Sequence, residues 1–179
     1  NGEIVARHRL SDPKMSIRHL DIARDGNIWV GCQYEGYSLD PLPLVAYTTP
    51  DHRLQWARGD RTRQGDVSKG PIWGLLNRYC GSVCCHPRLP AVAVSSPRGH
   101  HVLLWASDTG RYLRSFRLRD VCGLAADAQA GFLASTGKGE VWQLPANDLS
   151  GNADLLWRGK YRWDNHMISL SQSASIISI

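Results

Sequence analysis

Long apolar runs are missing from this chain of 179 residues. None approaches the roughly 18 consecutive apolar residues that a membrane-spanning helix requires, so we expect no membrane span. Phenylalanine and methionine are also scarce, with two of each, whereas tryptophan occurs seven times and glycine 17 times. Short apolar runs punctuated by glycine, proline, aspartate and asparagine are typical of short strands joined by turns, and they argue against a helical fold.

Clustered charge of one sign is absent as well. The formal net charge is +5, from 21 lysines and arginines against 16 acidic residues. The densest basic segment, residues 53–69, also contains Asp60 and Asp66. Scattered basic residues favour an ordinary solvated surface, so we expect no nucleic-acid partner.

Familiar catalytic and metal-binding spacings are not present either. The five cysteines are an odd number and cannot all pair within one chain. The spacing of Cys80, Cys84 and Cys85 is not that of a zinc ribbon, and Cys84 and Cys85 are expected on opposite faces of one strand. There is no Gly-x-Ser-x-Gly elbow, and "STGKGE" lacks the spacing of a phosphate-binding Walker loop. None of these spacings therefore points to an enzyme.

The informative feature is an internal repeat. Each repeat consists of a short strand, a turn and a second strand that ends in small or polar residues. The three copies are "RHLDIARDGNIWVGCQ", "GSVCCHPRLPAVAVSS" and "VCGLAADAQAGFLAST". Their matching pairs are His19 with Gln33, Ser82 with Ser96, and Cys122 with Thr136, each 14 residues apart. Third strands are expected at Pro43–Tyr47, His101–Trp105 and Gly139–Leu144, and the clearest fourth strand is Tyr112–Leu118.

Four antiparallel strands per repeat are the pattern of propeller blades. The repeats start 63 and 40 residues apart, and an insertion over Leu54–Asn77, with a short helix over Ile72–Tyr79, explains the longer interval. The predicted fold is therefore all-β, a partial β-propeller of the WD40 type with three complete blades.

Partial blades are expected at both ends of the chain. Residues 1–6 resemble a fourth strand, and Trp163–Leu170 resembles a first strand. Residues 1–170 would be the C-terminal half of a propeller, and residues 171–179 a terminal strand or tail. Because a propeller must close, typically with about four to eight blades, we expect either a missing N-terminal half or self-association.

Several short motifs occur in an order that resembles one known family. They are "SIRHL", "PLVAY", "RYCGSV", "SSPRG", "STGKG" and "WDNHM", together with Gln33–Gly36 and Asp120–Ala125. As a set they resemble the bacterial domain-of-unknown-function family 1513. The resemblance implies an exported, periplasmic propeller of about twice this length, often encoded beside imelysin-type iron-regulated proteins. It implies a link to iron or metal handling, a possible periplasmic protein partner, and no established reaction.

Equivalent repeat positions should meet at one rim of the propeller axis. The residues expected there are Arg18, His19, Ser82, Asp120, Cys122, Asn165 and His166. His19, Cys122 and His166 would suit a borderline metal such as zinc, copper or iron. Two alternatives are an anion or small-ligand pocket and a set of hydrogen bonds that fix the register between blades.

A second set of polar residues ends the second strands of the repeats. It comprises Gln33, Ser96 with Arg98, and Thr136 with Lys138. A cation beside glycine-rich backbone can bind anions, although ordinary turn chemistry explains the same residues.

The function expected from these features is a non-catalytic periplasmic propeller that binds a ligand or partner at its axial rim. The competing hypothesis is a metal-dependent hydrolase or oxidoreductase that uses the histidines and the cysteine of the rim.

Overall fold

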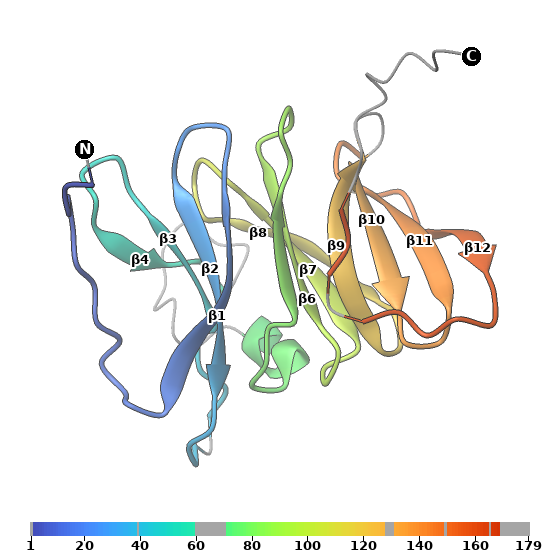
Figure 1. Cartoon of the computed structure of the whole chain (residues 1–179), viewed down its shortest axis with the longest axis horizontal. Helices are drawn as coiled ribbons and strands as arrows, with labels where there is room; N and C mark the ends of the chain where they lie inside the picture. The colour runs from blue at the N-terminus through green and yellow to red at the C-terminus, as the bar shows by residue number, and fades with distance from the viewer. Residues whose placement is uncertain are drawn as a thin grey trace.

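The chain folds into three four-stranded antiparallel sheets that stand side by side (Figure 1). This computed structural model describes residues 2–38, 40–59, 71–127, 131–148, 150–164 and 166–168. The first sheet contains β1 (Met15–Ile22), β2 (Ile28–Tyr34), β3 (Val45–Thr48) and β4 (Leu54–Trp56). The second contains β5 (Ser82–Cys85), β6 (Ala91–Ser96), β7 (His101–Ala106) and β8 (Tyr112–Arg117). The third contains β9 (Val121–Asp127), β10 (Gly131–Thr136), β11 (Glu140–Pro145) and β12 (Asp154–Arg158).

Each sheet is an antiparallel meander in which the strands follow one another in chain order. The first hairpin shows how the sequence makes the turns. Gly26 adopts a φ of 85°, which glycine tolerates without steric cost, and the Asp25 carboxylate accepts the Asn27 backbone N–H at 3.1 Å. The all-β fold and the three complete blades predicted from the repeat are confirmed.

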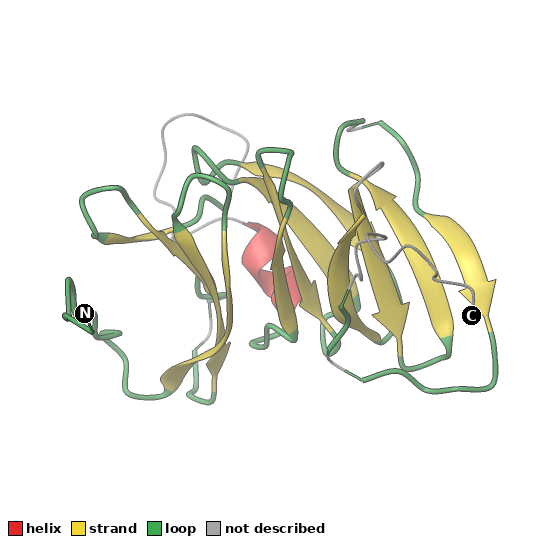
Figure 2. Ribbon diagram, turned by 45° about the horizontal axis from the view of Figure 1, so that its top comes forward, coloured by secondary structure: helices red, strands yellow, loops and turns green. Residues whose placement is uncertain are grey.

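The predicted helix is shorter than expected. Pro71–Leu76 forms a 3-10 helix, η2, which lies between the first and second sheets (Figure 2). Its end was predicted at Tyr79, but Asn77 and Arg78 take left-handed φ values of 42° and 61°, which stop the helical path. No helix in the described ranges is long and apolar enough to cross a membrane.

The predicted insertion also needs correction. Its first residues, Leu54–Trp56, form β4 and complete the first blade, so the extra segment begins only after this strand. Residues 60–70, within it, lie outside the described part of the chain.

Neither end of the described chain forms the expected strand. Residues 2–14 run without a strand, and so do residues 159–164 and 166–168. A strand needs a hydrogen-bonding neighbour in its own sheet, and each of these segments precedes or follows a blade that already has four strands. The predicted tail, residues 171–179, lies outside the described residues.

The core consists of two apolar clusters, one on each face of the second sheet. In β6, Val92 and Val94 point to the cluster shared with the first sheet, and Ala91 and Ala93 to the cluster shared with the third. In β5, Cys85 and Cys84 divide in the same way, as the sequence predicted. Strand side chains alternate between faces, so a strand between two sheets buries both of its faces, and β6 is apolar except for the buried Ser95 and Ser96 at its end.

The first and second sheets approach closely at Gly31 of β2. A Cβ atom on Gly31 would lie 2.8 Å from both Cys80 Cβ and Val83 Cγ2. Close by, the Cys80 N–H donates to the Cys32 carbonyl at 3.1 Å, which joins β2 to the segment before β5. The absence of a side chain at residue 31 therefore sets the spacing of these two blades.

Replacing Gly31 tests this spacing. Gly31→Ala should lower the free energy of unfolding by about 1–3 kcal/mol, because a methyl group overpacks the joint between the blades. Gly74→Ala is the control, since its Cβ would meet only Pro41 Cγ at 3.7 Å. Urea unfolding measures both, and an equal effect of the two substitutions would contradict the assigned role of Gly31.

Candidate functional site

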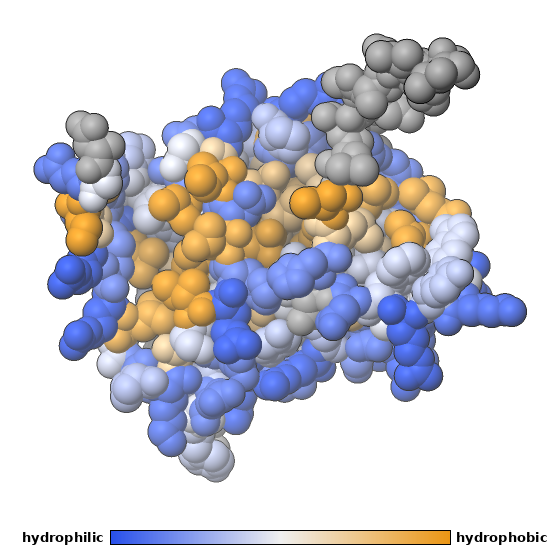
Figure 3. Space-filling view, in the orientation of Figure 1, coloured by the Kyte–Doolittle hydropathy of each residue, from blue (hydrophilic) through white to orange (hydrophobic). Residues whose placement is uncertain are grey.

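The first strands of the three blades form one surface, which we call the inner-strand face. It consists of β1, β5, β9 and residues 166–168, and it contains an open cleft of about 760 Å³. Apolar side chains gather across the middle of this view of the molecule (Figure 3). Residues lining the cleft include His19, Leu20, Ile22, Ser82, Leu124 and His166.

Two of the predicted rim histidines meet on this face. The ring centroids of His19 and His166 are 5.6 Å apart, and the ring planes are inclined at 61°. A register shift between Ile17 and His19 marks a bulge in β1 just before the histidine. Residue 166 lies close to β9. A Cβ atom placed on Gly123 of β9 would be only 3.0 Å from the His166 carbonyl carbon.

The environment of His19 favours its neutral form. Burial lowers the pKa of His19 below the usual value of a histidine, and the positive charges of His166 and Arg18 act in the same direction. Arg18 is exposed on β1. The face therefore presents an imidazole that resists protonation beside an exposed cation.

Cys122 does not line the cleft that contains the two histidines. Its thiol donates to the Asp120 carbonyl at 3.1 Å, and its own carbonyl accepts the Ser95 hydroxyl at 2.5 Å. Burial raises the pKa of Cys122 to about 11, and the negative charge of Asp120 adds to the effect. Cys122 therefore takes part in a hydrogen bond that joins the second and third blades.

Asp120 forms the turn that leads into β9. Its φ is 58°, its N–H donates to His100 Nδ1 at 3.0 Å, and its carbonyl accepts the Gly137 N–H at 2.9 Å. Within the described ranges no three His, Cys, Asp or Glu residues are grouped so that they could hold a metal ion. Asn165, the remaining predicted rim residue, lies outside those ranges.

The other cysteines are unsuited to nucleophilic chemistry. All five cysteines are free and buried. Burial raises the pKa of Cys32 and of Cys84 to about 12, and it raises the pKa values of Cys80 and Cys85 as well. The thiolate is the reactive form of cysteine, and a raised pKa keeps these thiols protonated. They are therefore poor nucleophiles.

The second set of predicted residues is spread over separate loops. Gln33 is buried and donates to the Glu35 carboxylate at 2.8 Å. The Ser96 hydroxyl donates to the Leu76 carbonyl at 2.6 Å and ties β6 to η2. The Arg98 guanidinium lies over the Tyr79 ring, 4.8 Å from its centroid.

The third loop of this set is close to an acidic residue. The Thr136 hydroxyl accepts the Lys138 N–H at 3.3 Å and donates to the Glu140 carboxylate at the same distance. Lys138 itself is exposed. Loops from different blades therefore carry these residues, and anion binding by them stays a prediction.

The sequence analysis missed the exposed apolar residues of β1. Leu20 and Ile22 are each 61% exposed and Ile17 is 47% exposed, although such residues in a strand normally indicate the core. The signal lay in the spacing of Leu20 and Ile22, two residues apart on one face of the strand.

Solved structures with the same arrangement of strands support the fold. The WD40 repeats of RRP9 superpose with a TM-score of 0.59 at 12% identity, covering 90% of this chain and 45% of that one. A luciferin-regenerating enzyme gives a TM-score of 0.52 at 10% identity, covering 83% of this chain and 47% of that one. The chain thus spans about half the length of these structures, and at such identities the likeness concerns the fold alone.

No curated protein has a significantly matching sequence. A family model does match, over residues 1–170, which agrees with the resemblance seen in the motifs. The chain therefore belongs to the family described as "Protein of unknown function (DUF1513)".

Proposed function

We propose that this chain is a non-catalytic binding or scaffold module that works through its inner-strand face. The observation that carries the proposal is the exposure of Ile17, Leu20 and Ile22 on β1, the first strand of the first blade. Contiguous exposed apolar side chains on a β-strand mark an interaction surface, because water solvates them poorly.

The occupant of this face would be further propeller blades. Asp21 of β1 contacts the second sheet, so Leu20 and Ile22 lie on the opposite face of the first sheet, which three blades leave uncovered. WD40 propellers, in contrast, close into a ring. The solved WD40 structure is about twice as long as this chain, which agrees with the need for more blades. For this chain alone, a second copy would supply these blades and complete the ring.

A non-catalytic role agrees with the chemistry of the titratable groups. The thiols have raised pKa values, and polar groups at the end of β5 and near the start of β9 are used in joints between blades. We further propose that this module is periplasmic and linked to iron or metal handling, which is what the family resemblance implies. A periplasmic protein partner would bind through the same face.

The competing proposal is a metal-dependent hydrolase or oxidoreductase. The contact between His19 and His166 favours it, since imidazoles are ligands for zinc, copper and iron. Cys122 does not fit as the third ligand in this arrangement, because its thiol points to the Asp120 carbonyl and its pKa is raised. Two imidazoles alone make a weak site, and no reaction step follows from them.

Self-association tests the main proposal. The chain should form dimers at micromolar concentration, and Leu20→Glu with Ile22→Glu should reduce the association constant by about tenfold or more, because a charge buried in an apolar interface is costly. Tyr37→Glu, at a loop position that is 83% exposed, is the control and should have no effect. Analytical ultracentrifugation measures the constants, and a wild-type chain that stays monomeric would refute the proposal.

The pH dependence of stability tests the environment of His19. Its pKa is lower in the folded state, so below about pH 6.5 the unfolded state takes up the proton first. The free energy of unfolding should therefore be independent of this group above about pH 6.5 and fall as the pH drops towards the folded pKa. In His19→Gln this fall should be smaller, whereas the exposed His8→Gln control should keep the wild-type profile. Identical profiles for His19→Gln and wild type would contradict the assignment.

Metal content separates the two proposals. Protein purified without a tag should contain much less than one metal ion per chain by elemental analysis, and His19→Ala and His166→Ala should not change this value. Stoichiometric metal that is lost in both variants, and kept in His8→Ala, would instead establish the metal site.

A further inference from the structure

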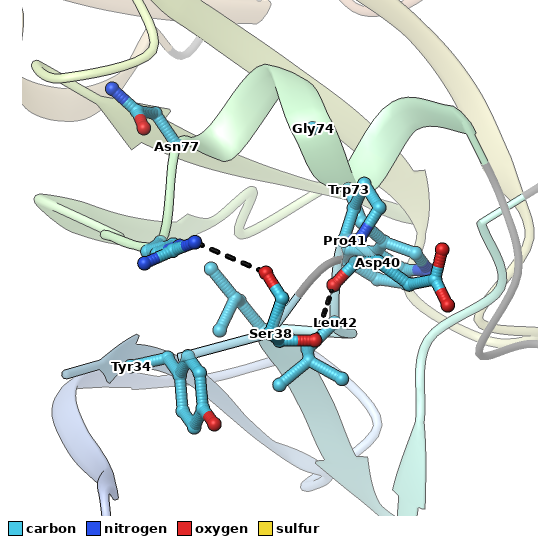
Figure 4. Close-up of a pocket in the computed structure, with 10 residues that line it drawn as sticks. Tyr34, Ser38, Asp40, Pro41, Leu42, Trp73, Gly74 and Asn77 are labelled. Carbon is cyan, nitrogen blue, oxygen red and sulfur yellow. Dashed lines mark hydrogen bonds between the residues drawn. The ribbon is translucent and has the colours of Figure 1, made fainter. Parts of the chain in front are cut away.

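A second cavity lies away from the inner-strand face, beneath η2. It is a pocket of about 130 Å³ between the loop that follows β2 and the 3-10 helix, and we call it the Trp73 pocket (Figure 4). Its walls include Tyr34, Leu42, Leu44 and Trp73. No residue of the rim or of the second polar set lines it, so a ligand here would be independent of the function proposed above.

The floor of the Trp73 pocket is apolar and rigid. Trp73 and Leu44 are each 1% exposed and Tyr34 is 7% exposed, and all three belong to the core between the first and second sheets. A volume of this size is close to that of an engineered cavity of about 150 Å³ that holds benzene. The floor therefore suits one compact apolar group, and it is too small for a nucleotide or a sugar chain.

The rim of the pocket carries two opposite charges. Arg78, which follows η2 in the chain, and Asp40, which lies in the loop after β2, both line the pocket. The Ser38 hydroxyl donates to the Asp40 carbonyl at 2.8 Å, which fixes the course of the loop at this residue. Figure 4 shows Ser38 and Asp40 together beside Leu42.

Arg78 is held in place over the loop. Its Nη1 donates to the Gly36 carbonyl and its Nη2 to the Ser38 carbonyl, both at 3.2 Å. These bonds use two of the five N–H donors of an arginine, and the others can meet a carboxylate, which guanidinium binds well.

Two consecutive residues that line the pocket have an unusual backbone conformation. Asn77 and Arg78 both have left-handed φ values, 42° and 61°, which are uncommon for residues other than glycine. The Asn77 side chain donates to the Arg98 carbonyl at 3.0 Å and helps to hold this conformation. Consecutive strained residues occur preferentially at functional sites, where the structure around them fixes a needed side-chain position.

We propose that the Trp73 pocket binds a free α-amino acid with an apolar side chain. The side chain would occupy the apolar floor, the carboxylate would meet Arg78, and the ammonium group would meet Asp40. A ligand with a single charge would leave one of the two rim charges without a counterpart, and a ligand without an apolar group would leave the floor empty.

Binding of three related probes to the intact chain tests this assignment. L-leucine carries both charges, L-leucinamide lacks the carboxylate, and 4-methylpentanoate lacks the ammonium group. Titration calorimetry should give the tightest binding for L-leucine. NMR spectra should show shifts at Trp73 and Gly74, which line the pocket.

Charge-neutralising variants assign each contact. Asp40→Asn should lower the affinity for L-leucine and L-leucinamide by about tenfold or more, since a hydrogen bond to a charged group is lost. The affinity for 4-methylpentanoate should not change. Arg78→Gln should lower the affinity for L-leucine and 4-methylpentanoate and leave the affinity for L-leucinamide unchanged. Arg117→Gln, which changes an exposed arginine outside the pocket, is the control.

Three results would overturn the proposal. They are no binding of L-leucine at about 10 mM, shifts that map away from Trp73, and equal affinities for all three probes. Because Arg78 also supports the loop, Arg78→Gln could unfold it; Asp40→Asn and the probe series remain decisive in that case. Self-association through the inner-strand face is measured separately, so failure here leaves that result unaffected.

Discussion

Packing of one sheet against the next is the interaction on which the rest of the structure depends. A four-stranded sheet has two faces, and the second sheet buries both, with Val92 and Val94 on one side and Ala91 and Ala93 on the other. Burial of apolar area contributes roughly 25 cal/mol per Å², so two buried faces supply much of the stability of the chain. Gly31 sets the distance between the first two sheets, since no side chain fits between it and Cys80.

The same packing determines where polar groups can act. Inner strands approach one another closely, so polar atoms at their ends must find partners across the joint. The Asp21 carboxylate accepts the Cys85 N–H at 2.7 Å, and the Ser95 hydroxyl meets the Cys122 carbonyl. Cys122, one of the residues predicted as a metal ligand, therefore takes part in a joint between blades. His19 and His166 differ, because they lie along the open cleft of the inner-strand face.

Two candidate binding regions result, and they have different physical characters. The inner-strand face is wide, open and apolar, which suits a macromolecular surface such as further blades. The Trp73 pocket is small, with an aromatic floor and one charge of each sign at its rim, which suits a small zwitterion. Its floor comes from the core of the first joint, and its rim comes from the loop after β2 and from the residues that follow η2.

Much of the fold followed from the repeat, because strand alternation and turn residues are local signals: the second strands end at or next to Gln33, Ser96 and Thr136 as predicted. The opposite orientation of Cys84 and Cys85 followed from the same alternation. The contact of His19 with His166, the rotation of the Cys122 thiol toward Asp120, and the left-handed turn at Asn77 and Arg78 could not be derived in this way. They depend on neighbours far away in the chain, and it is the close approach of the packed blades that selects one side-chain direction among the several that a strand end allows.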